Sequence, residues 1–295
     1  MTNQFNVRCA VIIKFFRSVV CRLSRIAYLA KLSLVEVRLM CSRSLIPVSI
    51  LYTRHGELKF FISSRESFKY ISKLLTREPE MIDWIDSFSD GDAFMDIGAN
   101  IGTVSLYAGL KGHSVIAIEP SATNYDWLNK HIAANGLDGS IKAYSLALDF
   151  RTYLGTLNVT SNWGSGSNNH AGDAAEVFRS KSHGELFDPM TASTRGLQPV
   201  SHRQGAVIFA LDDFMDKFRL DVPAHIKLDV DGLEGQILRG AQKTLKSTDL
   251  RTLMVRLDVE DVDYCRTVIN EILNLGFKLG ERKIIKQKNH LFVRE

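Results

Sequence analysis

The stretch Phe94-Met-Asp-Ile-Gly-Ala-Asn-Ile-Gly-Thr-Val-Ser105 decides the fold of this chain. It predicts a buried strand, then a tight glycine turn, then the first turn of a helix. Gly98 and Gly102 remove side chains where the backbone is expected to come close to a ligand. Asp96 places a carboxylate at the carboxyl end of the strand, where ligands bind in an open α/β sheet.

The glycine spacing distinguishes two kinds of nucleotide site. A dinucleotide fingerprint reads Gly-x-Gly-x-x-Gly, whereas this loop reads Asp-x-Gly-x-Asn-x-Gly, with Asn100 in place of the second glycine. An acidic residue before the loop would repel a pyrophosphate, but it suits an amino group such as that of S-adenosylmethionine. This difference disfavours a nicotinamide-dependent oxidoreductase.

A second strand is predicted at Ser114-Val-Ile-Ala-Ile-Glu119-Pro120, and Glu119 ends it. A carboxylate about 20 residues after the glycine loop is placed to accept hydrogen bonds from a ribose diol. The alternative is a generic βαβ unit whose acids are only solvated. We expect the cofactor-binding set to be Asp96, Gly98, Asn100, Gly102, Glu119 and Ala147.

Three further stretches carry a resemblance to a known family. They are Ala206-Val-Ile-Phe-Ala-Leu-Asp-Asp-Phe214, His225-Ile-Lys-Leu-Asp-Val-Asp-Gly-Leu-Glu-Gly235 and Ile237-Leu-Arg-Gly-Ala241. With the glycine loop, they resemble the FkbM family of S-adenosylmethionine-dependent O-methyltransferases over roughly residues 50–295. One difference is Asp231, which stands where the family usually has Glu and reaches one methylene less far.

The resemblance implies both a fold and an activity. The implied fold is α/β, a class I methyltransferase Rossmann-like doubly wound sheet with an antiparallel last strand. The implied activity is methyl transfer to a hydroxyl, most often that of a sugar in a glycan or glycolipid. Two alternatives stay open: an O-methyltransferase for a polyketide-type small molecule, and a catalytically silent cofactor- or glycan-binding assembly factor.

The hydrophobic pattern divides the chain into three parts. We expect a basic amphipathic helical extension at 1–46, a hairpin and helix leading into the core at 47–92, and the methyltransferase domain at 93–295. The same pattern predicts helices at 64–87, 103–110, 233–245 and 264–275 and a strand at 141–148. A segment rich in Ser, Asn, Gly and His interrupts this domain at 160–205 and is either a lid or a plain surface insertion. Within it, Asn162 and Trp163 offer an amide and an aromatic face that suit a sugar ring.

The net charge of +4 is unevenly distributed along the chain. Residues 1–46 hold eight Lys or Arg and one Glu, so this part carries about +7 and the rest about −3. A protein whose catalytic part is mildly acidic is a poor candidate for an enzyme that acts on nucleic acid, because neutralisation of the phosphates dominates nucleic-acid binding. The basic extension lacks the uncharged run of a signal peptide or membrane span. It either packs on its own domain or contacts the inner face of a membrane peripherally, and we expect a cytoplasmic protein.

Acidic residues cluster at the carboxyl end of the strand predicted at 226–230. Asp229, Asp231 and Glu234 follow one another closely, and clustered carboxylates push one pKa upward, which favours base catalysis near neutral pH. They could also hold a divalent cation, or Glu234 could simply stabilise a helix start. Lys227 is expected to pair with one of these acids.

The predicted site residues therefore fall into two further groups. The catalytic candidates are Asp229, Glu234 and, as a weaker base that is more often structural, His290. The candidates for binding the acceptor are Asn162, Trp163, Asp231 and Arg256. No metal site is predicted, because the four cysteines have no metal-ligand spacing.

Overall fold

A computed structural model describes residues 46–74, 79–159, 170–173, 202–230, 232–257, 262–280 and 288–294. The chain divides into two compact units, Met1–Pro47 and Val48–Glu295, and the second contains the sheet and its helices. The helix predicted at 1–46 lies almost entirely outside the described residues. Among the described residues, no helix combines the length and the apolar character needed to span a membrane.

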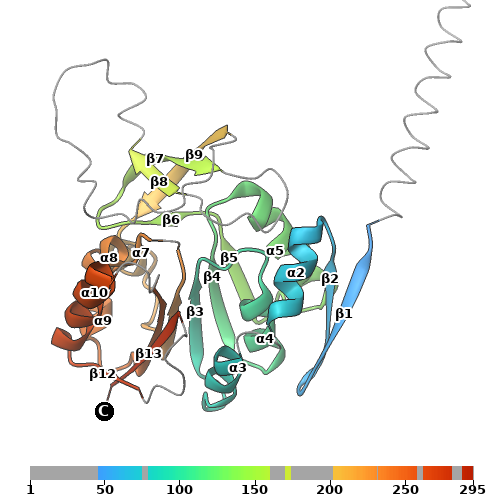
Figure 1. Cartoon of the computed structure of the whole chain (residues 1–295), viewed down its shortest axis with the longest axis horizontal. Helices are drawn as coiled ribbons and strands as arrows, with labels where there is room; N and C mark the ends of the chain where they lie inside the picture. Colours follow the sequence, from blue (N-terminus) through green and yellow to red (C-terminus); the bar gives the residue numbers. More distant parts are fainter. Residues whose placement is uncertain are drawn as a thin grey trace, which may run out of the picture. The chain divides into compact units, whose positions relative to one another are not determined.

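The core of the second unit is a seven-stranded sheet with the order β12-β13-β11-β10-β3-β4-β5 (Figure 1). The strands are β3 (Ala93–Ile97), β4 (Ser114–Ile118), β5 (Ile141–Tyr144), β10 (His225–Leu228), β11 (Thr252–Arg256), β12 (Lys278–Leu279) and β13 (Asn289–Val293). The five strands from β11 to β5 are parallel, whereas β13 runs antiparallel to both of its neighbours. This arrangement confirms the predicted doubly wound sheet with an antiparallel last strand.

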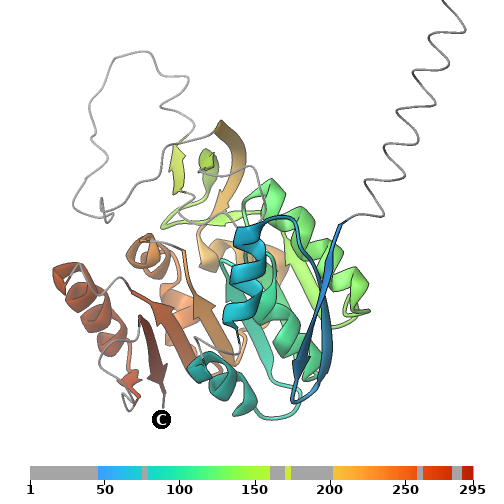
Figure 2. The same ribbon diagram turned by 45° about the vertical axis from the view of Figure 1, so that its right-hand side comes forward.

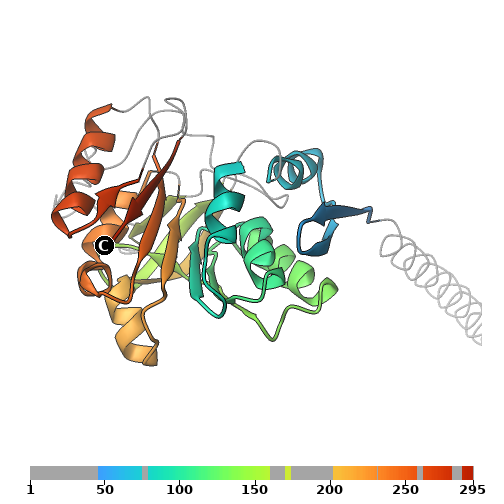
Figure 3. The same cartoon turned by 90° about the horizontal axis from the view of Figure 1, so that it is seen from below.

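Helices cover both faces of the sheet, as the view from below shows (Figure 3). One layer holds α3 (Pro79–Asp86), α4 (Thr103–Leu110) and α5 (Ala122–Ala134). The other holds α7 (Leu211–Phe218), α8 (Glu234–Arg239), α9 (Gln242–Lys246) and α10 (Val262–Asn274). Because side chains alternate along a strand, the two faces of the sheet contribute residues to two separate hydrophobic clusters, one under each helix layer.

A hairpin precedes the core, as predicted. Strands β1 (Val48–Thr53) and β2 (Gly56–Phe61) pair antiparallel around a two-residue turn. The side chain of Asn135, at the end of α5, fastens this hairpin to the core. Its Oδ1 accepts from Lys59 N at 2.7 Å, and its Nδ2 donates to Lys59 O at 2.8 Å. Helix α2 (Arg65–Lys73) then begins at Ser64, whose side chain caps it.

A second, four-stranded sheet with the order β6-β9-β7-β8 was not expected (Figures 1 and 2). Its strands are β6 (Ala147–Leu148), β7 (Tyr153–Val159), β8 (His170–Asp173) and β9 (His202–Phe209). The single strand predicted over 141–148 is split between the two sheets. β8 lies inside the segment 160–205, and β9 starts within it. The remainder of that segment, with Asn162 and Trp163, lies outside the described residues.

Two helices predicted as continuous are interrupted, and one was missed. The helix expected over 64–87 is described as α2 and α3, with Pro79 opening the second because its fixed φ suits a first helical position. The helix expected over 233–245 breaks at Gly240, where a Cβ would lie 2.3 Å from the carbonyl oxygen of Asp149. The missed helix is α7.

Candidate active site

The glycine loop after β3 is shaped by close packing and by backbone conformation. Gly98, Asn100 and Gly102 all have positive φ, of 80°, 52° and 92°. A Cβ on Gly98 would lie 1.9 Å from Asp229 O, and one on Gly102 would lie 2.4 Å from a Leu128 methyl. Backbone conformation and contacts inside the protein therefore favour glycine at both positions, and the close approach of a ligand stays a prediction. Asn100 is tolerated because asparagine is enriched in left-handed conformations.

Glu119, at the end of β4, is tied to this loop. Its Oε2 accepts from Asn100 N at 2.9 Å, and its Oε1 accepts from Ser121 N at 2.9 Å and Asn124 Nδ2 at 3.3 Å. Burial raises the Glu119 pKa to about 7, although these hydrogen bonds oppose the rise. A carboxylate has about four acceptor positions, so one position remains for a further donor.

Asp96 and Lys227 form an ion pair beneath the loop. Lys227 Nζ lies 2.9 Å from Asp96 Oδ1, and Ser105 Oγ donates to Asp96 Oδ2 at 2.6 Å. Burial alone would lower the Lys227 pKa, but Asp96 and Asp229 outweigh it and the pKa is raised. Both Asp96 oxygens are thus occupied inside the protein. Direct contact of Asp96 with a cofactor stays a prediction.

Asp229 and Arg256 are brought together at the carboxyl ends of β10 and β11. Asp229 N donates to Ile97 O at 3.1 Å, which places Asp229 beside the start of the glycine loop. Its Oδ2 lies 3.4 Å from Arg256 Nη1 and 3.7 Å from Lys227 Nζ. The Asp229 side chain is 18% exposed, so the carboxylate is reachable from solvent. Asp231 lies outside the described residues.

Glu234 turns back over the loop that follows β10. Its Oε1 accepts from Gly232 N at 3.1 Å and Val230 N at 3.4 Å, and Tyr264 OH lies 3.1 Å from its Oε2. Burial raises the Glu234 pKa to about 7. The side chain is buried and its hydrogen bonds hold this loop in place. Its role in proton transfer stays a prediction.

Tyr264, on α10, also holds the loop that follows β10. It accepts from Gly235 N at 3.0 Å and lies 3.2 Å from Gly232 O. Sequence reasoning assigned it only to a helix, because nothing in the local pattern indicates which side chain of α10 reaches the β10 loop.

His290 lies on β13 and Ala147 on β6. His290 pairs with Val255, which pairs with Leu228, so these three residues share the face opposite Lys227. Its Nδ1 donates to Lys288 O at 3.0 Å. Ala147 is buried in β6 of the second sheet. Both assignments stay predictions.

The Leu-Asp-Asp and Gly-Ala motifs contact each other. Asp212, on α7, accepts from Lys243 N at 2.7 Å and Thr244 N at 2.8 Å, which supplies the cap that α9 lacks in its own sequence. Asp212 N also donates to Gly240 O at 2.9 Å. These motif residues therefore stabilise the packing of α7, α8 and α9.

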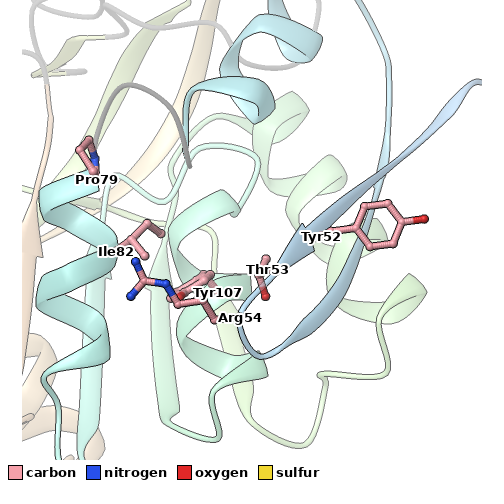
Figure 4. A pocket seen from close by; sticks show the side chains of 6 residues that line it. All are labelled: Tyr52, Thr53, Arg54, Pro79, Ile82 and Tyr107. Carbon is pink, nitrogen blue, oxygen red and sulfur yellow. The ribbon is translucent and has the colours of Figure 1, made fainter.

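A separate cavity of about 230 Å³ lies between the hairpin and the helices α3 and α4 (Figure 4). Tyr52, Thr53, Arg54, Pro79, Ile82 and Tyr107 line it. Its Arg54 is already paired with Asp86 at 2.8 Å. Over the residues whose positions the structure gives, no three His, Cys, Asp or Glu side chains cluster as metal ligands would.

The order and direction of the strands define a class I methyltransferase fold, with the glycine loop and Glu119 at the ligand-binding edge. The methyltransferase FkbM domain model matches residues 96–279, so the chain belongs to the FkbM methyltransferase family. No relative was found among curated proteins.

Several solved structures are similar to this chain. Methyltransferase FkbM from Methylobacillus flagellatus KT is 19% identical with a TM-score of 0.44, and the match covers 76% of this chain but only 47% of that one. A putative methyltransferase, yhhF from Escherichia coli, is 11% identical with a TM-score of 0.44, covering 84% of this chain and 99% of that one. The METTL16 methyltransferase domain is 12% identical with a TM-score of 0.45, covering 83% and 86%.

Proposed function

We propose that this chain is an S-adenosylmethionine-dependent O-methyltransferase that acts on a hydroxyl group of a sugar in a glycan or glycolipid. The observation that carries the proposal is that Glu119 and Asp229 are both hydrogen-bonded to the segment that forms the glycine loop. Asn100 N donates to Glu119 on one side of the glycine loop, and Asp229 N donates to Ile97 O on the other. A ribose-binding acid and an accessible carboxylate thus flank the same loop.

The residues present fit the proposed cofactor. Glu119 keeps one acceptor position for a ribose hydroxyl, and Asn100 Oδ1 is buried with no hydrogen-bond partner among the described residues. A buried acceptor of this kind is satisfied when a ligand donor reaches it. When bound, S-adenosylmethionine supplies a methyl group on a sulfonium that an oxygen can attack.

The chain's own residues would orient the acceptor and remove its proton. Asp229 would accept the proton of the acceptor hydroxyl. Arg256 and Lys227 lie on one side of Asp229 and fix the direction of its carboxylate. Alignment of the acceptor oxygen with the methyl group supplies much of the remaining acceleration.

The sugar acceptor and the membrane contact rest on the sequence. The family most often methylates sugars, and Asn162 and Trp163 are the side chains proposed to hold the ring. Residues 1–46 carry the basic charge that would bring the enzyme to the inner face of a membrane, beside lipid-linked glycans.

One experiment tests the acceptor and the reaction together. The gene is expressed in a host that lacks it, and the glycans and glycolipids are compared by mass spectrometry with those of an Asp229→Asn strain. A gain of one methyl group on a sugar in the wild-type strain alone supports the proposal. Methylation of a non-sugar small molecule, or none in either strain, contradicts it.

A further inference from the structure

The second sheet is attached to the segment after Glu119 through the side chain of Gln204. Gln204 Oε1 accepts from Ala122 N at 2.9 Å, and Gln204 Nε2 donates to Pro120 O at 2.8 Å. The oxygen and the nitrogen of the Gln204 amide therefore both bind the backbone of residues 120–122, at least 82 residues away in the sequence. The contact places the second sheet beside the N-terminal end of α5 (Figure 2).

The two backbone groups that Gln204 binds lie on either side of Ser121. Ser121 N is the donor to Glu119 Oε1, and Ser121 Oγ accepts from Asn124 N at 3.5 Å as the N-cap of α5. Ala122 is the first residue of α5, so its N–H has no partner within the helix. Gln204 satisfies this N–H and fixes the backbone that presents a donor to Glu119.

The placement of Gln204 within β9 explains why it reaches this segment. Gln204 lies opposite Leu157 of β7, and Leu157 is buried, so this face of the second sheet packs inward. The neighbouring Arg203 lies on the other face, is exposed, and donates within the sheet to Asn158 Oδ1 at 3.3 Å. The two residues are adjacent in sequence but serve different faces.

We propose that Gln204 is a positioning residue that couples the second sheet to the ribose-binding carboxylate of Glu119. With the amide in place, residues 120–122 are held and Ser121 N keeps Glu119 aimed at the ligand. Without the amide, Pro120 O and Ala122 N form hydrogen bonds with water, and residues 120–122 gain conformational freedom. Binding of a ribose must then order these residues, which lowers the affinity. This inference rests on the proposed cofactor.

The coupling is measured first without ligand. Hydrogen exchange is followed by mass spectrometry in the full-length wild type, Gln204→Met and, as the matched control, Arg203→Met. Methionine keeps the length of the side chain and removes the amide. We expect peptides covering 120–124 to exchange faster in Gln204→Met, and at the wild-type rate in Arg203→Met. Unchanged exchange in Gln204→Met overturns the proposal.

Ligand binding supplies the second measurement. Dissociation constants are measured by calorimetry for S-adenosylhomocysteine and for 5′-methylthioadenosine, which has the ribose but no amino-acid part. In Gln204→Met we expect both to weaken by the same factor, about tenfold, since two hydrogen bonds that order the segment are lost. Equal binding to the wild type and Gln204→Met overturns the proposal.

Two controls separate the possible failures. If Gln204→Met does not fold, as judged by circular dichroism, Gln204→Glu replaces it. Glutamate keeps the acceptor for Ala122 N but loses the donor to Pro120 O, so an exchange rate above that of the wild type is expected and a wild-type rate contradicts the coupling. If the wild type binds neither ligand, the proposed cofactor is wrong, while the exchange measurement still decides whether Gln204 holds this segment.

Discussion

The carboxylate of Asp96 and the ammonium group of Lys227 face each other 2.9 Å apart beneath the glycine loop. Their side chains are 0% and 4% exposed, so both charges are shielded from bulk solvent. The pair links β3 to β10, the two strands whose ends present the cofactor loop and Asp229. Charge balance inside the sheet therefore fixes the geometry of the site above it.

Removing one member of this pair should be strongly destabilising. Lys227→Met leaves Asp96 buried without its cation, and we expect a loss of about 3–5 kcal/mol in the free energy of unfolding, measured by urea denaturation. The control is Lys243→Met, which breaks an exposed pair with Asp216 and should cost less than about 1 kcal/mol. Equal losses in the two variants would mean that the buried pair contributes no more than the exposed one.

Glu119 should control cofactor affinity. Replacing it with Ala should weaken binding of S-adenosylhomocysteine by roughly 1–3 kcal/mol, the cost of losing charged hydrogen bonds. Because the Glu119 pKa is raised to about 7, its charged form is lost as the pH falls below that value, and wild-type affinity should fall with it. Calorimetry at several pH values, with NAD as the ligand expected not to bind, checks both statements. Comparable NAD affinity would contradict the cofactor assignment.

Asp229→Asn should abolish turnover while leaving cofactor binding largely intact, because we propose that Asp229 faces the acceptor. Turnover is measured with a radiolabelled methyl group and affinity with S-adenosylhomocysteine. A near-normal kcat would make Glu234 or His290 the better base. The same assay is repeated with a chelator, and activity lost there would indicate that these carboxylates act through a cation.

Glu234 should make stability fall as the pH rises from 4.5 to 7. Its pKa is raised from 4.5 to about 7, so the folded protein binds more protons than the unfolded chain in this interval. Charging Glu234 then costs about 3 kcal/mol by pH 7. Glu234→Gln should show a smaller loss over the same interval, measured by denaturation at each pH.

The difference between wild type and Glu234→Gln is the quantity to compare, because His225 acts in the opposite direction. Burial lowers the His225 pKa to about 4, so its contribution to stability rises with pH between 4 and 6.5. That contribution is common to both proteins and cancels. Parallel stability curves for the two proteins would contradict the role given to Glu234.

Residues 1–46 should increase binding to anionic membranes. Each Lys or Arg near such a surface contributes about 1 kcal/mol, and this part of the chain carries eight of them. Full-length protein and a protein starting at Pro47 are sedimented with anionic vesicles at low and high salt. We expect only the full-length protein to sediment, and only at low salt. Equal partitioning of the two would mean that the extension does not bind membranes.

The sequence predicted the sheet well because its signals are local. The helix expected at 103–110 is α4 as the structure has it, and the β3 strand and loop follow from consecutive residues. The partner of Asp96 was not predicted, because Lys227 lies 131 residues away and only the strand register brings them together. The close packing of Gly98 against Asp229 O was not predicted for the same reason, because the two residues are far apart in the sequence.

The second sheet escaped prediction for a different reason. Its strands β6 and β8 are short, and β6 follows closely after β5. The longer strands β7 and β9 include Gly155 and Gly205, which weaken a strand pattern. Gln204 has no motif around it that would indicate a contact with Pro120. Pairing between distant strands and side-chain contacts between sheets depend on the whole fold, so local sequence patterns do not predict them.

The contact between Asp212 and the start of α9 has a consequence for how this family is recognised from sequence. Asp212 and Gly240, two of its defining residues, maintain helix packing away from the loop that holds Asn100 and Glu119. A descendant that had lost methyl transfer would still need both of them in order to fold. Finding these motifs in a genome therefore identifies the architecture, whereas an intact Glu119 and Asp229 would be needed to infer an active enzyme.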